Sequence, residues 1–560
     1  MTKRLFALLC AAVLVLTMCS CGGTPQQSSA PPTQPGASSA QPGTPSATVQ
    51  PSAPPTPDVS GPSKTVTVAY GFRPRSLDPN NWNDNTDQVH FQMFYESLIY
   101  SDHTGGGYAP MLATSWEVSP DASSWTFKLR EGVSFSTGAP FDADDVVCTF
   151  EHLISLKDTS ANVLSYMPTI DSVEKIDQYT VKISFDGPFA LAGNAFRCMY
   201  IFSDEAFEEF GPEVAFDKDH SYGTGPWILN EYIDGQYAHY VKNENYWNKD
   251  KFDSYYEEVY SLHLSEPSSI VAGHLSGDIN AYCRIGGFDM DLLPLYASAQ
   301  DRISIVSMNT NSNDFVTCQL GEQSQVSDIN LRKAISYAID RQRLYDTLSQ
   351  GLGQGATFFW APNMPGFDPD CEAYAYDPEL AKEYLAASSY DGSPLRFMTE
   401  PSGINMNFAL AIADMLAKVG IDTLVQGEDS MTWNTRRAAS DYDLIMSGTR
   451  VPDKMPGRHL GTLLSDNSKT NNTDEVLFEL IRNFNVELDP AKREQLLSDI
   501  GNRCAEVYAP HIVVGHPGCN HAVDKGITGI SLYEDGMVNF AYIDYDGSAE
   551  PVYAFTGFKN

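Results

Sequence analysis

The sequence predicts a mixed α/β protein, and three observations lead to this prediction. Segments that alternate apolar and polar residues, as strands do, are interspersed with segments whose apolar residues recur at helical spacing. The chain has 560 residues, of which 42% are hydrophobic and 11% aromatic, enough for a large core divided among several lobes or domains. The segments do not follow the strict strand–helix alternation of a barrel, and the sequence has no internal repeat.

The first 21 residues have the form of a bacterial secretion signal. Lys3 and Arg4 give a positive start, and residues 5–18 form an apolar run. That run suits a signal sequence and is short for a membrane-spanning helix.

The apolar run leads into a motif that resembles a bacterial lipobox. Cys21 follows the small residue Ser20 and precedes Gly22, whereas Cys19 follows Met18, which fits the motif less well. We therefore expect lipid attachment at Cys21. The alternative is an ordinary secretory signal that is cleaved at a different nearby site.

Residues 22–63 consist almost entirely of Gly, Pro, Ser, Thr, Gln and Ala. Such a segment has too little apolar surface to offset the entropy of ordering. We expect a disordered tether that lets the folded body reach a membrane partner while staying mobile.

The strands and helices of the folded body follow from local patterns. Alternation predicts strands over residues 64–70, 125–130, 179–185 and 236–242. Helix starts are predicted at Ser327 or Asp328 and at Asp377, which precedes a proline, and a helix over 408–419 stops at Gly420.

The charge of the chain excludes some classes of partner. The formal net charge is −36, and about −37 remains on the folded body when Lys3, Arg4 and Asp58 are set aside. A surface this acidic repels nucleic acid and anionic lipid, so membrane attachment needs something other than a basic patch.

Seven cysteines follow the head, scattered and without a C-x-x-C pair. They are Cys148, Cys198, Cys283, Cys318, Cys371, Cys504 and Cys519. Because the number is odd they cannot all pair within one chain. We expect buried small apolar side chains, with one or two disulfides as the alternative.

Five groups of motifs occur in an order that identifies a family. They are SLDP (76–79) with FYESL (94–98), YAPMLATSWEV (108–118), WTFKLREGVSF (125–135) continuing to 144–146, GTGPW (223–227) with NENYW (243–247), and DINLRKAISYAIDR (328–341). In these motifs the chain from residue 64 onward resembles the family 5 extracellular solute-binding proteins, the oligopeptide, dipeptide and nickel binders of ABC importers.

The resemblance implies a three-lobed fold of the periplasmic-binding-protein type (type II, cluster C). Lobe I would comprise residues 64–100, 221–312 and 526–560, lobe II residues 101–220 and lobe III residues 313–525. A hinge between lobes I and III would close them over the ligand, burying it and excluding water. The resemblance also implies a monomer that delivers its ligand to the permease subunits of an ABC importer.

The first candidate site is the loop that follows the first strand. This part of the sequence aligns with peptide-binding relatives without a gap, and the stretch that faces the ligand in those relatives corresponds to Asn83, Asp84 and Asn85. These side chains offer donors and acceptors that suit an amide or hydroxyl ligand. The alternative is a plain Asx-turn loop.

The second group of candidates comes from the middle of the chain. The turn at 277–279 matches the family's pattern, and Tyr282 to Arg284 then fall where relatives line the cleft. Arg284 could hold a carboxylate with two hydrogen bonds; the alternative is a surface arginine. Asn309 enters lobe III, where we expect it to serve the ligand or a hinge.

The main departure from the family lies in residues 443–453. Peptide-binding relatives have a tryptophan-rich run here, ending in an aspartate that meets the ligand's amino group. This chain has Arg450 near the expected acid, and Asp453 comes late, which favours an anionic or unusual ligand. Trp433 and Trp360, expected in loops of the same lobe, could stack on a peptide side chain or a sugar; the alternative for each is core.

Catalytic and metal motifs are weak or missing from the sequence. It contains no H-E-x-x-H, no G-x-S-x-G and no phosphate loop. The spacing of His511, His516, Cys519 and His521 fits no standard zinc pattern, so we expect neither a metal site nor a cofactor. Some relatives bind nickel chelates, which leaves metal as a cargo open.

These observations favour an extracytoplasmic lipoprotein, not an enzyme, that captures a small solute for an ABC importer. A peptide is the leading solute. The alternatives are an oligosaccharide or metal-chelate binder on the same scaffold, and a lipoprotein sensor or adhesin that takes no part in transport.

Overall fold

The computed structural model describes most of the chain after residue 62. The described residues are 63–82, 85–102, 107–156, 170–211, 214–220, 222–250, 252–288, 290–371, 375–401, 403–449, 460, 464, 469–508, 510–533 and 536–547. All of them belong to one compact unit, Pro57–Asn560. The predictions of a signal, of lipidation at Cys21 and of a tether fall outside the described residues.

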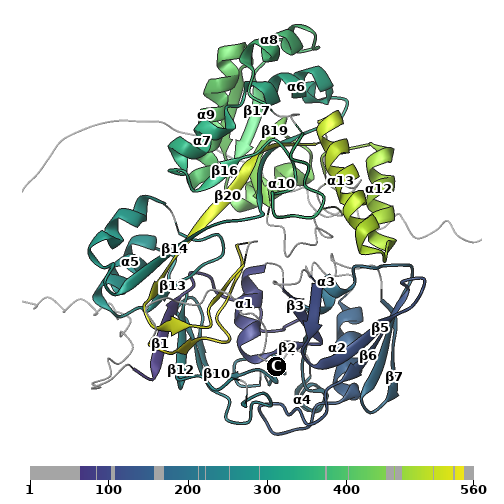
Figure 1. Ribbon diagram of the computed structural model, residues 1–560, viewed down its shortest axis with the longest axis vertical. Helices are drawn as coiled ribbons and strands as arrows, with labels where there is room; N and C mark the ends of the chain where they lie inside the picture. The colour runs from purple at the N-terminus through teal and green to yellow at the C-terminus, as the bar shows by residue number, and fades with distance from the viewer. Residues whose placement is uncertain are drawn as a thin grey trace, which may run out of the picture. The chain divides into compact units, whose positions relative to one another are not determined.

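A twelve-stranded mixed sheet runs through this unit (Figure 1). Its order is β10-β11-β12-β1-β13-β20-β15-β19-β17-β18, and β14 and β16 also pair with β20. The bounds are β1 Thr65–Ala69, β10 Trp227–Ile233, β11 Tyr237–Lys242, β12 Glu258–Leu262, β13 Ala281–Tyr282, β14 Ile303–Asn309, β15 Asn313–Cys318, β16 Gly353–Gly355, β17 Leu395–Thr399, β18 Thr423–Gly427, β19 Leu444–Thr449 and β20 His511–Asp524.

The long strand β20 connects the two halves of this sheet. Its C-terminal part pairs with β13 and β14, and its N-terminal part pairs with β15 and β16. Strands β14 and β15 follow each other along β20, with Asn309 opposite Gly518 and Asp314 opposite Gly515. Two antiparallel paths of chain therefore run from one half of the sheet to the other (Figure 1).

Smaller elements surround the sheet. The remaining strands are β2 Glu96–Ser97, β3 Ile99–Asp102, β4 Gly107–Pro110, β5 Ala113–Val118, β6 Ser124–Leu129, β7 Ile170–Asp177, β8 Thr180–Phe185, β9 Tyr200–Ile201, β21 Ile527–Thr528, β22 Ser531–Leu532, β23 Val538–Asn539 and β24 Asp544–Tyr545. Strands β5-β6-β8-β7 form a separate antiparallel sheet. The helices are α1 Asn85–Phe94, α2 Ala143–Ser155, α3 Gly193–Phe196, α4 Asp204–Phe210, α5 Pro267–Ser276, α6 Ile329–Ala338, α7 Arg341–Leu348, α8 Pro378–Ala386, α9 Gly403–Val419, α10 Ser430–Ala438, α12 Glu475–Val486 and α13 Pro490–Val507, with 3-10 turns η2 Met290–Ser298 and η3 Gln325–Ser327.

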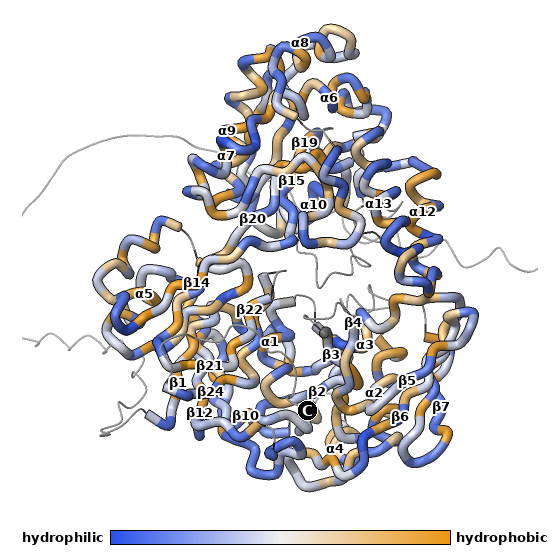
Figure 2. Tube along the Cα trace, viewed as in Figure 1, coloured by the Kyte–Doolittle hydropathy of each residue, from blue (hydrophilic) through white to orange (hydrophobic). Residues whose placement is uncertain are grey.

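The apolar side chains divide into two large cores. Members of the first core lie in residues 66–285 and 523–543. Among the described residues, members of the second core lie in 316–514, with the exception of Leu191. In Figure 2, α12 and α13 alternate apolar and polar stretches, as helices with one buried face do. The two cores divide close to the predicted ends of lobe III, but the lobe boundaries themselves stay a prediction.

The predicted strands and helix starts are confirmed. The segments 64–70, 179–185 and 236–242 contain β1, β8 and β11, and the segment 125–130 overlaps β6, which begins one residue earlier at Ser124. Asp328 caps α6 by accepting the N–H of Asn330, and Asp377 caps α8. Helix α9 begins at Gly403, earlier than predicted. The prediction missed its first turn because that turn is largely exposed and shows no apolar periodicity.

No disulfide joins the seven cysteines of the described structure. Five of them are buried, as expected of small apolar side chains. Burial raises the pKa of the Cys504 thiol to about 12, which keeps it protonated and unreactive. The alternative of one or two disulfides is not realised.

Three of the family-like motifs meet at the buried carboxyl group of Glu96. Its oxygens accept hydrogen bonds from Thr224 Oγ1 at 2.9 Å, Tyr246 OH at 3.0 Å and Trp247 Nε1 at 2.7 Å. Gly225 packs against the end of α1 so closely that a Cβ would lie 2.8 Å from a backbone carbon. These motifs therefore build the scaffold, whichever ligand the chain binds.

The described helices include none with the length and apolar character needed to cross a membrane.

Candidate functional site

Parallel strands end side by side at one edge of the large sheet. Strand β1 pairs in parallel with β12 and with β13, so Ala69 lies opposite both Leu262 and Tyr282. In open α/β sheets, ligands bind outside the carboxyl ends of parallel strands. The residues that directly follow these strands therefore form the first candidate site, and they include Phe72 and Arg284.

Arg284 is a charged residue of this edge that has no acidic partner among the described residues. Its guanidinium carbon lies 5.0 Å from the centre of the Phe72 ring, a cation–π distance. The side chain is half-buried, and its Nε is buried without a hydrogen-bond partner. No acidic side chain in the described part of the chain forms an ion pair with it. A partly desolvated cation without an anion is unfavourable, so the position suits an anionic ligand group.

Neutral aromatic residues support Phe72 from below. The ring of Tyr70 meets the ring of Phe72 edge-on, with 5.4 Å between ring centres, and His90 Nε2 donates to the carbonyl oxygen of Phe72 at 3.1 Å. The other ring nitrogen of His90 accepts from the Tyr240 hydroxyl at 2.9 Å. Burial lowers the pKa of His90 to about 4, so the ring is neutral near pH 7 and Arg284 provides the positive charge.

The predicted loop site reaches the same edge. The hydroxyl of Tyr70 donates to the carbonyl oxygen of Thr86 at 2.9 Å, and Thr86 follows Asn85, the first residue of α1. The candidates Asn83 and Asp84 lie outside the described residues. Part of the loop is an Asx turn, because the Asp78 carboxylate accepts the N–H of Asn80 at 3.0 Å.

Two further candidates occupy structural positions. Tyr282 is fully buried and stacks on Phe288, with 5.2 Å between ring centres. Asn309 Oδ1 accepts the N–H of Gly353 at 3.2 Å, which ties β14 to β16 where β20 passes between the two halves. This contact fits the hinge role of Asn309 better than the ligand role, and both roles stay predictions.

The two tryptophans of the second half do not lie in the same kind of environment. Trp433 lies in helix α10 and not in a loop as predicted. Asp429 caps this helix, so the helix begins at Ser430, before Trp433. It is half-buried, packs against a small core and has Arg437 over its ring at 5.4 Å. Trp360 is fully buried and its Nε1 donates to the carbonyl oxygen of Leu497 at 2.7 Å, which makes it core.

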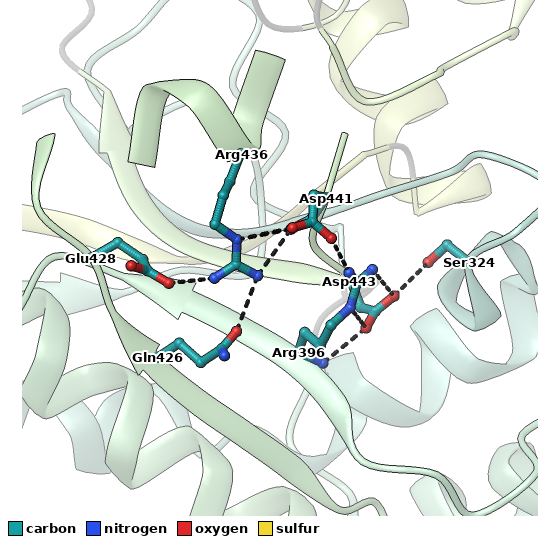
Figure 3. A network of polar contacts seen from close by, with 7 residues as sticks. All are labelled: Ser324, Arg396, Gln426, Glu428, Arg436, Asp441 and Asp443. Atoms are coloured by element: carbon teal, nitrogen blue, oxygen red, sulfur yellow. Dashed lines mark hydrogen bonds and ion pairs between the residues drawn. The ribbon is translucent and has the colours of Figure 1, made fainter. Parts of the chain in front are cut away.

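Arg396 and Arg436, next to and on α10, form ion pairs, unlike Arg284. Figure 3 shows Arg396 bonded to Asp441 and Asp443, and Arg436 bonded to Asp441 and Glu428. Arg396 Nε lies 3.0 Å from an Asp443 oxygen. These side chains connect β17, β18 and β19 to α10 and leave little charge to attract a ligand. Arg450, the predicted candidate just beyond β19, lies outside the described residues.

Two buried asparagines near β20 were not predicted. Asn311 and Asn313 are each 1% exposed. Within the described structure Asn313 Oδ1, Asn313 Nδ2 and Asn311 Oδ1 have no hydrogen-bond partner, a state that costs about 1–3 kcal/mol for each buried group. Asn313 pairs with Thr449, the residue before Arg450. The signal in the sequence was the N-T-N-S-N run that begins at Asn309.

The histidines of β20 are occupied by structural contacts. His511 bonds to Thr317 Oγ1 at 3.0 Å, and His516 Nδ1 donates to the carbonyl oxygen of Ser312 at 3.0 Å. The described residues contain no group of three side chains suited to hold a metal ion.

Comparisons with known proteins agree on one family. Residues 107–471, more than half of the chain, match the model of the bacterial extracellular solute-binding proteins, family 5 (middle region). The nickel-binding periplasmic protein of Escherichia coli K12 is 25% identical over 408 residues, which cover 69% of this chain and 75% of that protein. The periplasmic oligopeptide-binding protein OppA of Haemophilus influenzae is 24% identical over 483 residues, covering 79% of this chain and 84% of the relative.

A solved structure shows the same fold. The dipeptide-binding protein of Pseudoalteromonas sp. SM9913, in complex with Met-Leu, superposes with a TM-score of 0.74 at 19% identity. The match covers 86% of this chain and all of that one. The predicted α/β fold with several lobes is thereby confirmed.

Proposed function

Because the chain belongs to the bacterial extracellular solute-binding proteins of family 5, we propose that it captures a small solute and delivers it to the permease of an ABC importer. Proteins of this family are extracytoplasmic binding proteins and not enzymes. For this chain we propose that the solute is a peptide and that the protein binds it in part through an anionic group of the peptide.

The proposal of an anionic group rests on one observation, the guanidinium of Arg284, which has no acidic partner among the described residues. It sits on the Phe72 ring at the carboxyl edge of parallel strands, with its Nε buried and without a partner. An arginine fork binds a carboxylate with two parallel hydrogen bonds. Every peptide with an unmodified C-terminus carries such a carboxylate, and two relatives are named for binding peptides.

The other predicted residues complete the proposed site. Asn83, Asp84 and Asn85, which precede Thr86 in the sequence, would contact the solute from the first half, and Arg450 and Trp433 would contribute from the second half. A metal chelate with carboxylate ligands presents the same anionic chemistry, and one relative is named for nickel.

Attachment to the membrane is proposed to run through lipid on Cys21 and the tether over 22–63. The net charge of −36 supports a covalent anchor, because an acidic body is repelled by anionic lipid. Exchanging Cys21→Ser should release the protein from the membrane fraction. Unchanged membrane retention of that variant would contradict the anchor and leave solute binding untouched.

The solute proposal is tested by calorimetry on the full chain in detergent. The panel contains di- to hexapeptides, oligosaccharides and nickel with histidine. A ligand at about 100 times its Kd should stabilise the protein by about 2.7 kcal/mol. Arg284→Ala should weaken peptide binding by about 10- to 100-fold, the loss expected for hydrogen bonds between charged groups.

A matched control is Arg482→Ala on α12, whose side chain is 64% exposed and 3.8 Å from Glu475. It should leave binding unchanged. If peptide binding survives Arg284→Ala, another residue must hold the anionic group of the peptide. Binding of oligosaccharides alone would replace the peptide proposal, and a stripped protein that binds none of the panel would point to a sensor or adhesin.

A further inference from the structure

We propose that Asn311 and Asn313 form a buried subsite that reads an amide group of the bound solute. This inference rests on the proposed function for the identity of the solute as a peptide. It adds a specificity site of neutral polar chemistry to the charged site at Arg284.

The position of the two side chains is defined by their neighbours on β20 and β19. Asn311 lies in the short segment between β14 and β15, and Asn313 is the first residue of β15, opposite Thr449. The next residue, Asp314, accepts a hydrogen bond from the Tyr345 hydroxyl at 2.6 Å. The segment is therefore held firmly at the point where the chain passes from one half of the sheet to the other.

The hydrogen-bonding state of these residues is unusual for a protein interior. Both side chains are 1% exposed, and Asn313 has neither its acceptor nor its donor satisfied. Asn311 Nδ2 reaches only the sulfur of Met364, at 3.4 Å, and its Oδ1 has no partner. The large majority of buried side-chain polar atoms in natural proteins are paired, so two neighbouring carboxamides with unsatisfied atoms require an explanation.

The energetics favour a role for Asn313 beyond packing. Leucine has nearly the same shape and would leave no buried polar atom unsatisfied, so packing alone favours leucine at this position. A side chain that is retained against this preference gains its partners in another state of the protein. The bound state of a solute-binding protein is such a state.

The chemistry of a carboxamide selects the partner. It presents an oxygen that accepts and an NH₂ group that donates, side by side. A peptide bond offers the complementary pair, one N–H and one C=O. A carboxylate can only accept and would leave Oδ1 unsatisfied, so these residues complement the peptide chain and not its charged end.

The test compares an amide with an ester on the full chain. The probes are tetraalanine and its analogue in which esters replace the internal amides, titrated by calorimetry. The wild type should bind the amide at least 10-fold more tightly than the ester, because the ester lacks the N–H that Asn313 Oδ1 accepts. Equal affinity for the two probes would overturn the proposal.

The variant Asn313→Leu should bind tetraalanine at least 10-fold more weakly and lose most of its preference over the ester. Its ligand-free melting temperature should be equal to or above that of the wild type, which shows that the variant folds. The control Asn502→Leu changes an exposed asparagine on α13 and should keep both affinities. Unchanged affinity and preference in Asn313→Leu would overturn the subsite.

Other outcomes separate this inference from the proposed function. A wild type that binds oligosaccharide or nickel with histidine, but not tetraalanine, overturns the amide subsite and leaves solute capture standing. A wild type that binds no probe overturns both. Peptide binding that depends on Arg284 and not on Asn313 overturns the subsite alone.

Discussion

The backbone N–H of Ala190 donates to the carbonyl oxygen of Asn485 at 2.8 Å, joining a loop of the first half to the end of α12. The neighbouring Leu191 is 1% exposed and packs with the second core, although it follows strand β8 in the sequence. Phe189 contacts both cores. The segment 186–192 therefore links two parts of the fold that otherwise bury their apolar side chains separately.

This contact predicts the effect of truncating Leu191. Leu191→Ala should lower the free energy of unfolding of the second half by about 2–4 kcal/mol, because it leaves a cavity in a buried cluster. Amide hydrogen exchange in α12 should accelerate more than exchange in α2, which lies in the first half. The control Ile176→Ala removes a side chain that is 56% exposed and should change stability little. Equal effects of the two variants would show that Leu191 contributes no link.

Glu96 predicts a stability that falls as pH rises. Burial raises the pKa of its carboxyl group from 4.5 to about 7, against the opposing effect of its hydrogen bonds. Between these values the folded state holds a proton that the unfolded state releases, so the contribution is complete below pH 4.5 and is lost as pH rises to about 7. Relative to Glu96→Gln, the wild type should lose about 3 kcal/mol across this window. Urea denaturation at a series of pH values measures this, and parallel profiles for the two proteins would refute it.

His90 predicts the opposite trend. Burial lowers its pKa from 6.5 to about 4, so between these values the unfolded state binds a proton that the folded state does not. The contribution of His90 is complete above pH 6.5 and is lost as pH falls to about 4, by about 3 kcal/mol. The variant His90→Gln cannot titrate and should remove this acid sensitivity. Because the trends of Glu96 and His90 oppose each other, the stability of Glu96→Gln should rise more with pH than that of the wild type, and the stability of His90→Gln should rise less.

Local interactions made part of this structure predictable from sequence. Asp328 and Asp377 cap their helices through N–H groups two or three residues away, so the signal and its consequence lie in the same short segment. The same holds for the alternating strands, whose faces follow from the period of the chain.

Burial of single side chains depends on distant segments and was not predictable in the same way. Asn313 is paired with Thr449, and Trp433 packs against Met398 and Tyr442, all remote in sequence or separated by turns. The motif containing Glu96 was visible, but its meeting with the motif of Trp247 was not. A site made by such meetings needs the fold before it can be recognised.

The network around α10 predicts a cost for removing its central cation. Arg436 is 15% exposed and bonds to Glu428, which is 19% exposed, and to Asp441. Arg436→Ala leaves Glu428 partly buried without its counterion, and should lower the free energy of unfolding by about 2–4 kcal/mol. Arg482→Ala breaks an exposed pair instead and should cost less than about 1 kcal/mol. Denaturation by urea separates the two, and a loss in Arg436→Ala no larger than in Arg482→Ala would mean that solvent already compensates Glu428. Solute affinity should stay unchanged in Arg436→Ala, because this guanidinium is committed to the scaffold while that of Arg284 is not.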